Sequence, residues 1–359
     1  MADIRLEGLH KEFNDGEVVA VRDLNLTFRE GTTTCLLGPS GCGKTTLMRI
    51  IAGLEKPSAG RVFFGDEDVT DLKTRDRNLG MVFQYPVVYR GITVRQNLAL
   101  PLRADPLSDA EKKQRVDELL EMIDLEDVAD TDVGKLDGGT RQKVAVARAV
   151  SRHAPIILFD EPITNVDPDL KLQLKRTLRE LFSRLNQTII YVTHDQTEAM
   201  TLADEIALMQ DGAIEQMAPP RELYNKSESV FGGWFLGNPG MNFMTVEGHQ
   251  SVATTVAGAS LADAVKTIGF RPEDVSISIG PANNGIAATV EHTAVVAGGQ
   301  YLVNLRADDI RLKAKLPWDA ATVPTIGEAV TISVPAHRIR KFDMDEVAVL
   351  ETVAESDQP

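Results

Sequence analysis

One glycine-rich stretch constrains this chain more than any other part of its sequence. It runs from Gly38 to Thr46, reads GPSGCGKTT, and stands between an apolar run and a helix-like pattern. A buried strand that turns through glycines into a helix gathers backbone N–H groups and a helix N-terminus at one point, which suits a polyphosphate. We therefore predict a nucleoside triphosphate site in which Lys44 binds the β and γ phosphates and the Thr45 hydroxyl binds Mg²⁺. The residues expected to contact the nucleotide here are Gly38, Pro39, Ser40, Gly41, Cys42, Gly43, Lys44, Thr45 and Thr46.

Charge and cysteine content narrow the class of protein. The formal net charge of −15 leaves no basic excess to displace counterions from nucleic acid, so we expect no nucleic-acid partner. The two cysteines, Cys35 and Cys42, lie beside and within the glycine-rich turn, where a disulfide is unfavourable, and this favours a reduced, cytoplasmic protein. The N-terminal residues do not resemble a secretory signal, and no apolar run is long enough to span a bilayer. We therefore expect any contact with a membrane to require a partner.

The length of 359 residues and a change in sequence texture favour two domains. Residues 1–236 alternate strand-like and helix-like segments, with a helical insert over about 85–150, and they predict an α/β P-loop NTPase fold. Residues 237–359 lose the helical periodicity and predict a small all-β, OB-like domain. The segments that alternate most clearly there are 275–279, 301–305 and 330–334.

Polar side chains follow three of the buried strand patterns in the first domain. Asp160 and Glu161 end one apolar run, His194 ends another, and Gln84 follows a third. Because the carboxyl ends of parallel strands meet at one ligand-binding edge, we expect Asp160 to hold Mg²⁺ and Glu161 to polarise the attacking water. Gln84 is a candidate to touch the metal or the water, and His194 to hydrogen-bond the γ-phosphate. Alternatively, Gln84 is only a polar loop residue and His194 is a structural histidine.

Two further positions are candidates for nucleotide contact. Phe13 precedes an Asn-Asp-Gly turn and is either a core aromatic or a ring that stacks on adenine. Asp137 precedes two glycines and Thr140 at the start of a helical pattern, where uncovered N–H groups suit an anion. Asp137 has an alternative role as a helix N-cap. The candidate contacts in this second stretch are Asp137, Gly138, Gly139 and Thr140.

The beginning of the helical insert has an unusual composition. Residues 85–89 read YPVVY and are apolar in a segment that otherwise resembles a loop. Such a surface beside a nucleotide fold is where a partner could dock. A loop that only packs against its neighbours is equally consistent with this composition.

Taken together, these residues resemble the ATP-binding subunits of ABC transporters, and specifically the carbohydrate-uptake importers with a C-terminal TOBE or OB-like domain. The resemblance spans nearly the whole chain. Gly38 to Thr45 is similar to the Walker A loop, Gln84 to the Q-loop, and Leu136 to Thr140 to the signature motif. Residues 156–160 resemble Walker B with Glu161 as the catalytic glutamate, residues 164–167 the D-loop, and His194 the switch histidine. Phe13 falls where the family stacks an aromatic ring on adenine.

The resemblance implies an ATPase that energises solute import with ATP and Mg²⁺ as cofactors. Two such subunits would close face to face, each ATP held between the phosphate loop of one and the signature helix of the other. The transmembrane permease subunits would dock on the helical insert near residues 85–97, and an extracytoplasmic solute-binding protein would act through the complex. The chain would then be a peripheral protein on the cytoplasmic face of the inner membrane.

The signature motif departs from the family pattern. Asp137 stands where the family usually has serine, and Thr140 where it usually has glutamine. A carboxylate that faces a triphosphate would offset part of the positive helix end, so we predict a weakened or inactive site if Asp137 faces it. The subunit would then form either a homodimer or, as Asp137 suggests, a heterodimer in which one composite site fires.

The solute is the least constrained part of the prediction. The degenerate signature and the residues after Gln84 resemble ATPase subunits of glycerol-type importers, which makes glycerol or another polyol our first expectation. Sugar or glycerol phosphate is the alternative. A soluble, non-transport ABC ATPase is a further alternative, although the second cassette or coiled-coil insertion that such proteins carry is not visible here.

Overall fold

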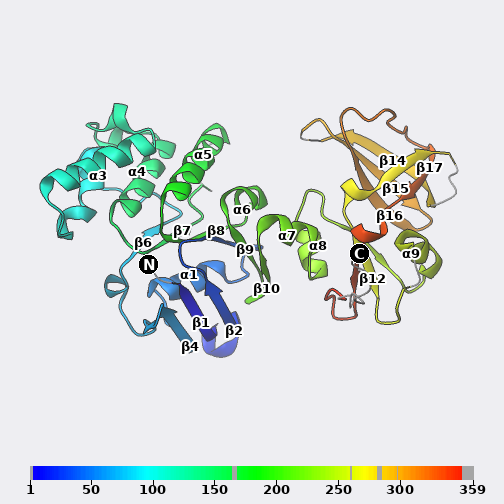
Figure 1. Ribbon diagram of the computed structural model, residues 1–359, viewed down its shortest axis with the longest axis horizontal. Coiled ribbons are helices and arrows are strands. Elements are labelled where there is room, and N and C mark those ends of the chain that lie inside the picture. Colours follow the sequence, from blue (N-terminus) through cyan, green and yellow to red (C-terminus); the bar gives the residue numbers. More distant parts are fainter. Residues whose placement is uncertain (1–2, 164–167, 259–260, 281–284, 297, 350–359) are drawn as a thin grey trace, which may run out of the picture. The chain divides into compact units, whose positions relative to one another are not determined.

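The structure is a computed structural model that describes residues 3–163, 168–258, 261–280, 285–296 and 298–349, apart from the side chains of 104 and 168–170. The chain forms two compact units, Met1–Arg221 and Glu222–Pro359 (Figure 1). Each unit has its own sheets and hydrophobic core. From the sequence we expected the first domain to end at residue 236 and the second to begin at residue 237. That boundary between separately folding domains stays a prediction.

A six-stranded sheet forms the centre of the first unit, in the order β10-β9-β3-β8-β7-β6. The strands from β9 to β6 in that order run parallel, and β10 pairs antiparallel to β9 at one edge. Every residue of β3 and β8 is buried, as expected for parallel strands covered on both faces. The strands are β3 (Thr33–Leu37), β6 (Leu79–Val82), β7 (Ile156–Asp160), β8 (Thr188–Thr193), β9 (Glu205–Gln210) and β10 (Ala213–Ala218).

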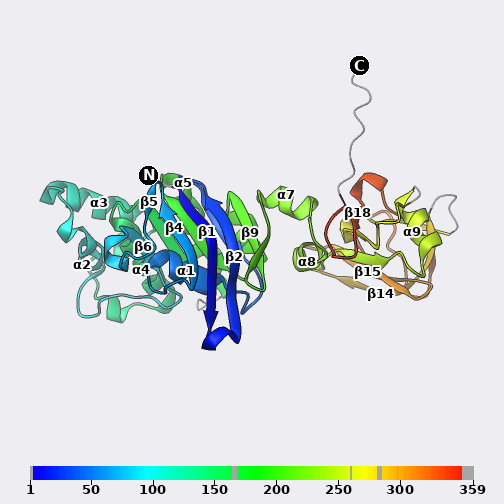
Figure 2. The same cartoon turned by 90° about the horizontal axis from the view of Figure 1, so that it is seen from below.

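A second, antiparallel sheet has the order β2-β1-β4-β5 and forms a separate layer (Figure 2). Helix α1 (Lys44–Ala52) follows the glycine-rich turn, and its buried Leu47 and Ile50 join a core that draws residues from both sheets. Burial of each such side chain contributes about 1.5–3 kcal/mol, which holds α1 against the sheets. The strands are β1 (Ile4–Phe13), β2 (Val18–Phe28), β4 (Ala59–Phe64) and β5 (Glu67–Asp68).

The helical insert consists mainly of α2 (Val94–Ala99), α3 (Asp109–Met122) and α4 (Gly138–Ser151). Capping boxes begin the first two helices, with Thr93 paired to Gln96 and Ser108 paired to Glu111. The apolar residues that helical spacing predicted to share one face, Val116, Leu119, Leu120 and Ile123, are all buried. Helices α5 (Pro168–Arg184) and α6 (Gln196–Leu202) flank the parallel sheet.

The second unit contains a three-stranded sheet, β11-β12-β18, and a five-stranded sheet, β13-β17-β14-β15-β16. This confirms the predicted β domain, and it adds a helix, α9 (Gln250–Ala257), that we did not predict. The strands are β11 (Asn242–Thr245), β12 (Thr267–Phe270), β13 (Ser276–Ile279), β14 (Ile286–Val295), β15 (Tyr301–Ala307), β16 (Ile310–Leu316), β17 (Ala329–Ser333) and β18 (Arg340–Phe342). The remaining helices are α7 (Pro220–Asn225) and α8 (Val230–Phe235), and the short 3₁₀ turns are Asn14–Gly16, Thr74–Asp76, Pro101–Ala104, Glu126–Val128, Val133–Lys135, Pro272–Asp274 and Ala336–Arg338.

Arg271 joins the segments of the second unit. Its side chain is 3% exposed, and its guanidinium donates to the backbone carbonyls of Gly233 at 3.0 Å, of Tyr224 at 2.7 Å and of Leu236. The Tyr224 ring lies under the same guanidinium, 4.0 Å from its carbon. One buried cation thereby satisfies the backbone of two short helices that have little core of their own.

Candidate nucleotide site

The glycine-rich turn connects β3 to α1 and lies against the ends of two other strands. A Cβ atom added at Gly38 would lie 2.1 Å from the Met209 carbonyl oxygen, and one added at Gly43 would lie 2.1 Å from that of Ala20. Gly43 also has a φ of +107°, a conformation that favours glycine. The turn is therefore held close to neighbouring backbone, in a shape that side chains at these two positions would prevent.

Lys44 lies inside the loop that precedes it. Its side chain is 5% exposed, and its ammonium donates at 2.8 Å to the carbonyls of both Gly38 and Pro39. The ammonium is also 3.6 Å from the Cys42 sulfur. The loop therefore surrounds a full positive charge, next to the N–H groups at the start of α1, and this combination suits a polyphosphate.

The strand register brings the predicted polar residues to the same edge of the sheet. Leu37 at the end of β3 pairs with Thr193 at the end of β8, and Asp160 at the end of β7 pairs with Val192. The loop that follows β3 therefore lies at the same edge of the sheet as the residues that end or follow β7 and β8, namely Asp160, Glu161 and His194. This is the edge where open parallel sheets bind ligands.

Asp160 contacts Thr45 and lies among charges of both signs. Burial, together with the neighbouring charge of Glu161, raises the pKa of Asp160 above its ordinary value, while Arg49, Lys44 and the Thr45 hydroxyl oppose that rise. The donor set of one carboxylate and one hydroxyl fits Mg²⁺, which usually takes one or two protein oxygens and completes its coordination with phosphates and water. Among the residues that the structure describes, no group of three or more His, Cys, Asp or Glu side chains could hold a metal ion.

Glu161 and His194 face each other at this edge. The His194 Nδ1 lies 3.3 Å from a Glu161 carboxylate oxygen, with the histidine side chain 48% exposed and the glutamate side chain 19% exposed. Glu161 has a φ of +43°, which is uncommon for a residue with a side chain, and its backbone N–H donates to the Val192 carbonyl at 3.0 Å. Unusual backbone of this kind concentrates at functional sites.

Gln84 and Phe13 are the two predicted contact residues that come from loops or strand ends near β6 and β1. Gln84 lies half-buried in a bend two residues after β6. Phe13 ends β1, is half-buried and does not belong to the core cluster. The Lys11 ammonium sits 4.6 Å from the centre of this ring and pairs with Glu55 at 2.8 Å.

Asp137 is the N-cap of α4, the alternative role noted from the sequence. One carboxylate oxygen accepts from the Thr140 backbone N–H at 2.9 Å and the other from the Thr140 hydroxyl at 2.6 Å. These hydrogen bonds hold the pKa of Asp137 below its usual range, so the carboxylate is charged at neutral pH. A Cβ atom at Gly138 would meet nothing within 4 Å, and the helix N-terminus is therefore accessible.

Sequence reasoning missed two cations at this site. Arg49 follows Thr45 by four residues on α1, so helical spacing places it on the same face, where its charge acts on Asp160. Lys11 precedes Phe13 by two residues on a strand, so both side chains point to one side of the sheet. Periodicity could have indicated both. The predicted D-loop, residues 164–167, lies outside the described residues.

The apolar start of the insert is exposed. Tyr85 is 69% exposed and Tyr89 54%, and the Arg148 guanidinium stacks on the Tyr89 ring at 4.7 Å. A cavity of about 240 Å³ adjoins this loop and is lined in part by Phe83, Val87 and Arg148. Within the described residues, no helix is both long and apolar enough to cross a membrane.

Comparisons with known proteins cover both units. Residues 21–164 match the family described as ABC transporter, and residues 268–342 match the TOBE domain. The chain is 38% identical over 353 residues to the sn-glycerol-3-phosphate import ATP-binding protein UgpC 3 of Agrobacterium fabrum, across 96% of this chain and 98% of that protein. It is 39% identical over 301 residues to the trehalose import ATP-binding protein SugC of Mycobacterium tuberculosis, across 81% of this chain and 75% of that protein.

A solved structure matches 61% of the chain. It is the dimeric structure of a post-hydrolysis state of the ATP-binding cassette MJ0796 bound to ADP and Pi. The TM-score is 0.53 at 32% sequence identity, over 61% of this chain and 99% of that one. The matched fold therefore includes a nucleotide-binding cassette that forms dimers.

Proposed function

This chain belongs to the ABC transporter ATP-binding family, as an import ATP-binding subunit that hydrolyses ATP to drive transport, and on this premise we propose how its residues act and what it serves. The observation that carries the proposal is the distance of 3.3 Å between the His194 Nδ1 and a Glu161 carboxylate oxygen. These residues lie at the sheet edge where the loop that contains Lys44 leaves β3. Such a pair can hold and polarise a water next to a phosphoryl group bound by the loop.

The proposed roles follow from the positions of the side chains. Lys44 and the loop N–H groups bind the β and γ phosphates, and the Phe13 ring stacks on adenine. Glu161 orients the attacking water and accepts its proton, while His194 hydrogen-bonds the γ-phosphate. Gln84, two residues after β6, is assigned to the same water or to the metal.

Thr45 and Asp160 are the proposed protein ligands of Mg²⁺. When bound, this ion would neutralise charge on the phosphate oxygens. The raised pKa of Asp160 supports the assignment, because a carboxylate that burial and Glu161 disfavour as an anion gains most from a cation beside it. Gln84 is the proposed further ligand.

We propose that the subunit works as a dimer in which the α4 N-terminus of each chain faces the nucleotide of the other. The accessible N-terminus at Gly138 supports this arrangement. The charged Asp137 carboxylate would stand between that helix end and the γ-phosphate. We therefore favour a heterodimer, in which a second ATPase chain with a different signature completes the active composite site, over a homodimer.

The exposed loop with Tyr85 and Tyr89, and the cavity beside it, are the proposed docking place of the transmembrane permease. Docking there would hold the subunit at the cytoplasmic face of the inner membrane. An extracytoplasmic solute-binding protein would act through the same complex. If the chain were instead a soluble ABC ATPase, tagged full-length protein would not co-purify with integral membrane subunits.

The proposed solute is a polyhydroxylated compound, with glycerol or a glycerol derivative ahead of sugars. The support is the naming of similar proteins for sn-glycerol 3-phosphate and for trehalose import. The deciding experiment measures ATPase stimulation in the reconstituted complex with glycerol, sn-glycerol 3-phosphate and a disaccharide in turn. Stimulation by the disaccharide alone would refute the glycerol assignment, and no stimulation by any of the three would refute the solute class.

A further inference from the structure

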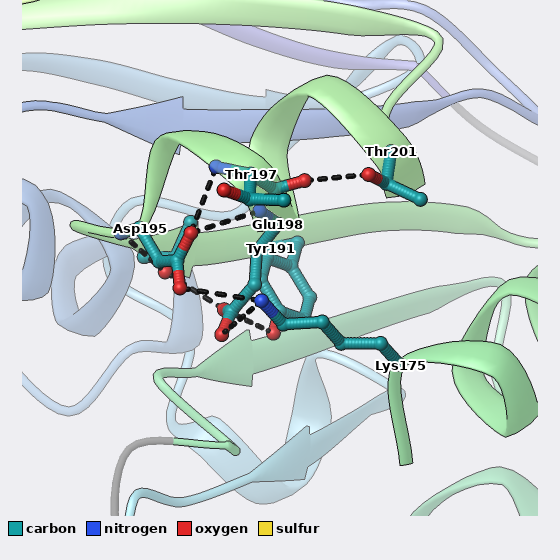
Figure 3. Close-up of polar contacts among 7 residues, drawn as sticks. Lys175, Tyr191, Asp195, Thr197, Glu198 and Thr201 are labelled. Atoms are coloured by element: carbon teal, nitrogen blue, oxygen red, sulfur yellow. Dashed lines mark hydrogen bonds and ion pairs between the residues drawn. The ribbon is translucent and has the colours of Figure 1, made fainter. Parts of the chain in front are cut away.

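A polar network with a buried centre includes Thr193 and Asp195, the two chain neighbours of His194, and Figure 3 shows its contacts around Lys175, Tyr191, Asp195 and Glu198. Glu198, on α6, is 4% exposed, and its carboxylate accepts from the Tyr191 hydroxyl at 2.8 Å and from the Thr193 hydroxyl at 2.8 Å. The Lys175 ammonium, which reaches in from α5, lies 3.6 Å from the other carboxylate oxygen. Three elements that are separate in sequence, α5, β8 and α6, therefore meet at one carboxylate.

Asp195 connects this network to His194, which precedes it in the chain. One of its carboxylate oxygens caps α6 by accepting from the backbone N–H groups of Thr197 at 2.8 Å and Glu198 at 3.1 Å. The other accepts from the Lys175 ammonium at 3.2 Å. The Asp195 N–H in turn donates to the Thr193 hydroxyl at 3.0 Å. Thr193 and Asp195, the chain neighbours of His194, are therefore both held by contacts within this network.

The charges make Lys175 the centre of this arrangement. Its one ammonium, 16% exposed, lies between two carboxylates, of which that of Glu198 is 5% exposed. A carboxylate this far from water is costly unless a cation and hydrogen-bond donors compensate it. Burial alone would raise the pKa of Asp195, but the Glu198 N–H and the charge of Lys175 hold it below its usual value. The Asp195 carboxylate is therefore charged at neutral pH.

We propose that Lys175 is a positioning residue for ATP hydrolysis, which holds residues 193–195 through Asp195 and Glu198 so that the His194 ring stays against Glu161. The inference rests on the role proposed above for His194. It adds a residue from a different element, 19 positions away in the chain, whose ammonium contacts Asp195 and Glu198. Its effect should fall on the rate of hydrolysis and spare the binding of ATP, because the phosphate loop is not part of the network.

The plainer role for this network is packing of α5 against α6, and the two roles make different predictions. A packing role would lower thermal stability and leave the kinetics of the folded protein unchanged. A positioning role lowers kcat in protein that is folded and binds ATP normally, because a displacement of about 1 Å in a catalytic group can cost about a hundredfold in rate. The distinguishing readout is therefore kcat against KM.

The experiment uses the full chain in its purified transporter complex and compares Lys175→Met, Lys175→Arg, His194→Ala and the control Arg176→Met, whose residue is exposed on the same helix. Mg-ATP turnover gives kcat and KM, and displacement of a fluorescent ATP analogue gives affinity. We expect Lys175→Met to lower kcat about tenfold or more, with KM and affinity within about twofold. Lys175→Arg should keep most of the activity and Arg176→Met all of it.

A double variant tests the charge argument. Glu198→Gln keeps an oxygen that can accept from Tyr191 and Thr193 but removes the charge, so Lys175→Met combined with Glu198→Gln should be more active than Lys175→Met alone. If Lys175→Met does not fold, Asp195→Asn replaces it, since asparagine still caps the helix but loses the ion pair. Unchanged kcat in that variant would overturn the proposal.

The outcomes separate this inference from the function on which it rests. If His194→Ala lowers kcat while folded Lys175→Met does not, Lys175 is a packing residue and the inference is wrong. If His194→Ala itself leaves kcat unchanged, the proposed role of the histidine fails first, whatever Lys175 does. If Lys175→Met raises KM in proportion to its loss of activity, the residue acts on ATP binding, which also contradicts the inference.

Discussion

The carboxylate of Asp137 accepts hydrogen bonds from both the backbone N–H and the hydroxyl of Thr140, at 2.9 and 2.6 Å. These are the two positions at which, on the resemblance described from the sequence, we expect the chain to depart from the usual family signature. Their departures are therefore coupled, since each residue satisfies the other at the start of α4. A substitution of Thr140 that removes its hydroxyl leaves Asp137 with the backbone N–H as its partner at this position.

The first prediction concerns this pair. Asp137→Ser together with Thr140→Gln should raise ATPase activity in the assembled transporter, by about fivefold if the carboxylate costs about 1 kcal/mol at the helix end. Asp137→Ser alone should raise it less, because Thr140 remains. Serine also caps helices well, so the melting temperature should hardly change. An unchanged or lower rate in the double variant would contradict the inhibitory role of Asp137.

The second prediction separates nucleotide binding from hydrolysis. Glu161→Gln should lower kcat by about 10²–10⁴ while Mg-ATP still binds, because the amide cannot accept the proton of the attacking water. Lys44→Ala should instead abolish binding of the fluorescent ATP analogue. Size-exclusion chromatography with ATP should show a longer-lived dimer for Glu161→Gln than for the unaltered chain. Normal turnover in Glu161→Gln would remove it from the proposed mechanism.

A third test addresses adenine stacking. Phe13→Ala should weaken ATP binding by about 1–3 kcal/mol, the usual value of a base on an aromatic ring, while Phe13→Trp should not. Binding of inorganic triphosphate, which has no base, is the internal control and should be the same in all three proteins. Equal weakening of both ligands would indicate that Phe13 supports the loop and does not stack.

The fourth prediction follows from the pKa of Asp160, which burial and the charge of Glu161 raise in the folded state. A raised folded-state pKa means that ionisation favours unfolding, so this contribution to stability is present below the unfolded-state pKa and is lost as pH rises through the folded-state pKa. Asp160→Asn should therefore raise the melting temperature of nucleotide-free protein at neutral pH, by about 2–4 °C if the gain is about 1 kcal/mol. The gain should shrink in acid, and a pH-independent difference would refute the electrostatic cause.

The fifth prediction concerns the second unit. Arg271→Leu should cost about 2–4 kcal/mol, because it leaves several buried backbone carbonyls without a donor. Calorimetry of the full chain should show a lower transition that is not shifted by ATP. The matched control is Arg338→Leu, which removes a half-exposed pair with Asp274 at 3.6 Å and should have little effect.

Much of the site could be predicted because its signals are local. The loop around Lys44 is one contiguous motif, and Asp160 and His194 each end a run of buried residues that marks a strand. Parallel strand order then brings such ends together without further information. The N-cap role of Asp137 was also readable, since Asp before a helical pattern is a common cap.

What could not be predicted depends on contacts between distant positions. Nothing near Lys175 in the sequence indicates that its ammonium reaches Asp195 and Glu198, because that pairing depends on how α5 packs beside α6. Helix α9 was missed for a different reason: its sequence, QSVATTVA, is rich in β-branched residues, which favour strands. Burial of Ala253 and Val256 on one face outweighs that preference.

The left-handed backbone of Glu161 limits which residues evolution can place there. With φ at +43°, valine, isoleucine and threonine are disfavoured by sterics before their chemistry is considered, whereas asparagine, aspartate and glycine fit with little strain. Paralogues that have lost hydrolysis should therefore drift toward that small set. A saturation library selected for folding alone would recover the same residues, which gives an inventory of tolerated side chains that is independent of transport.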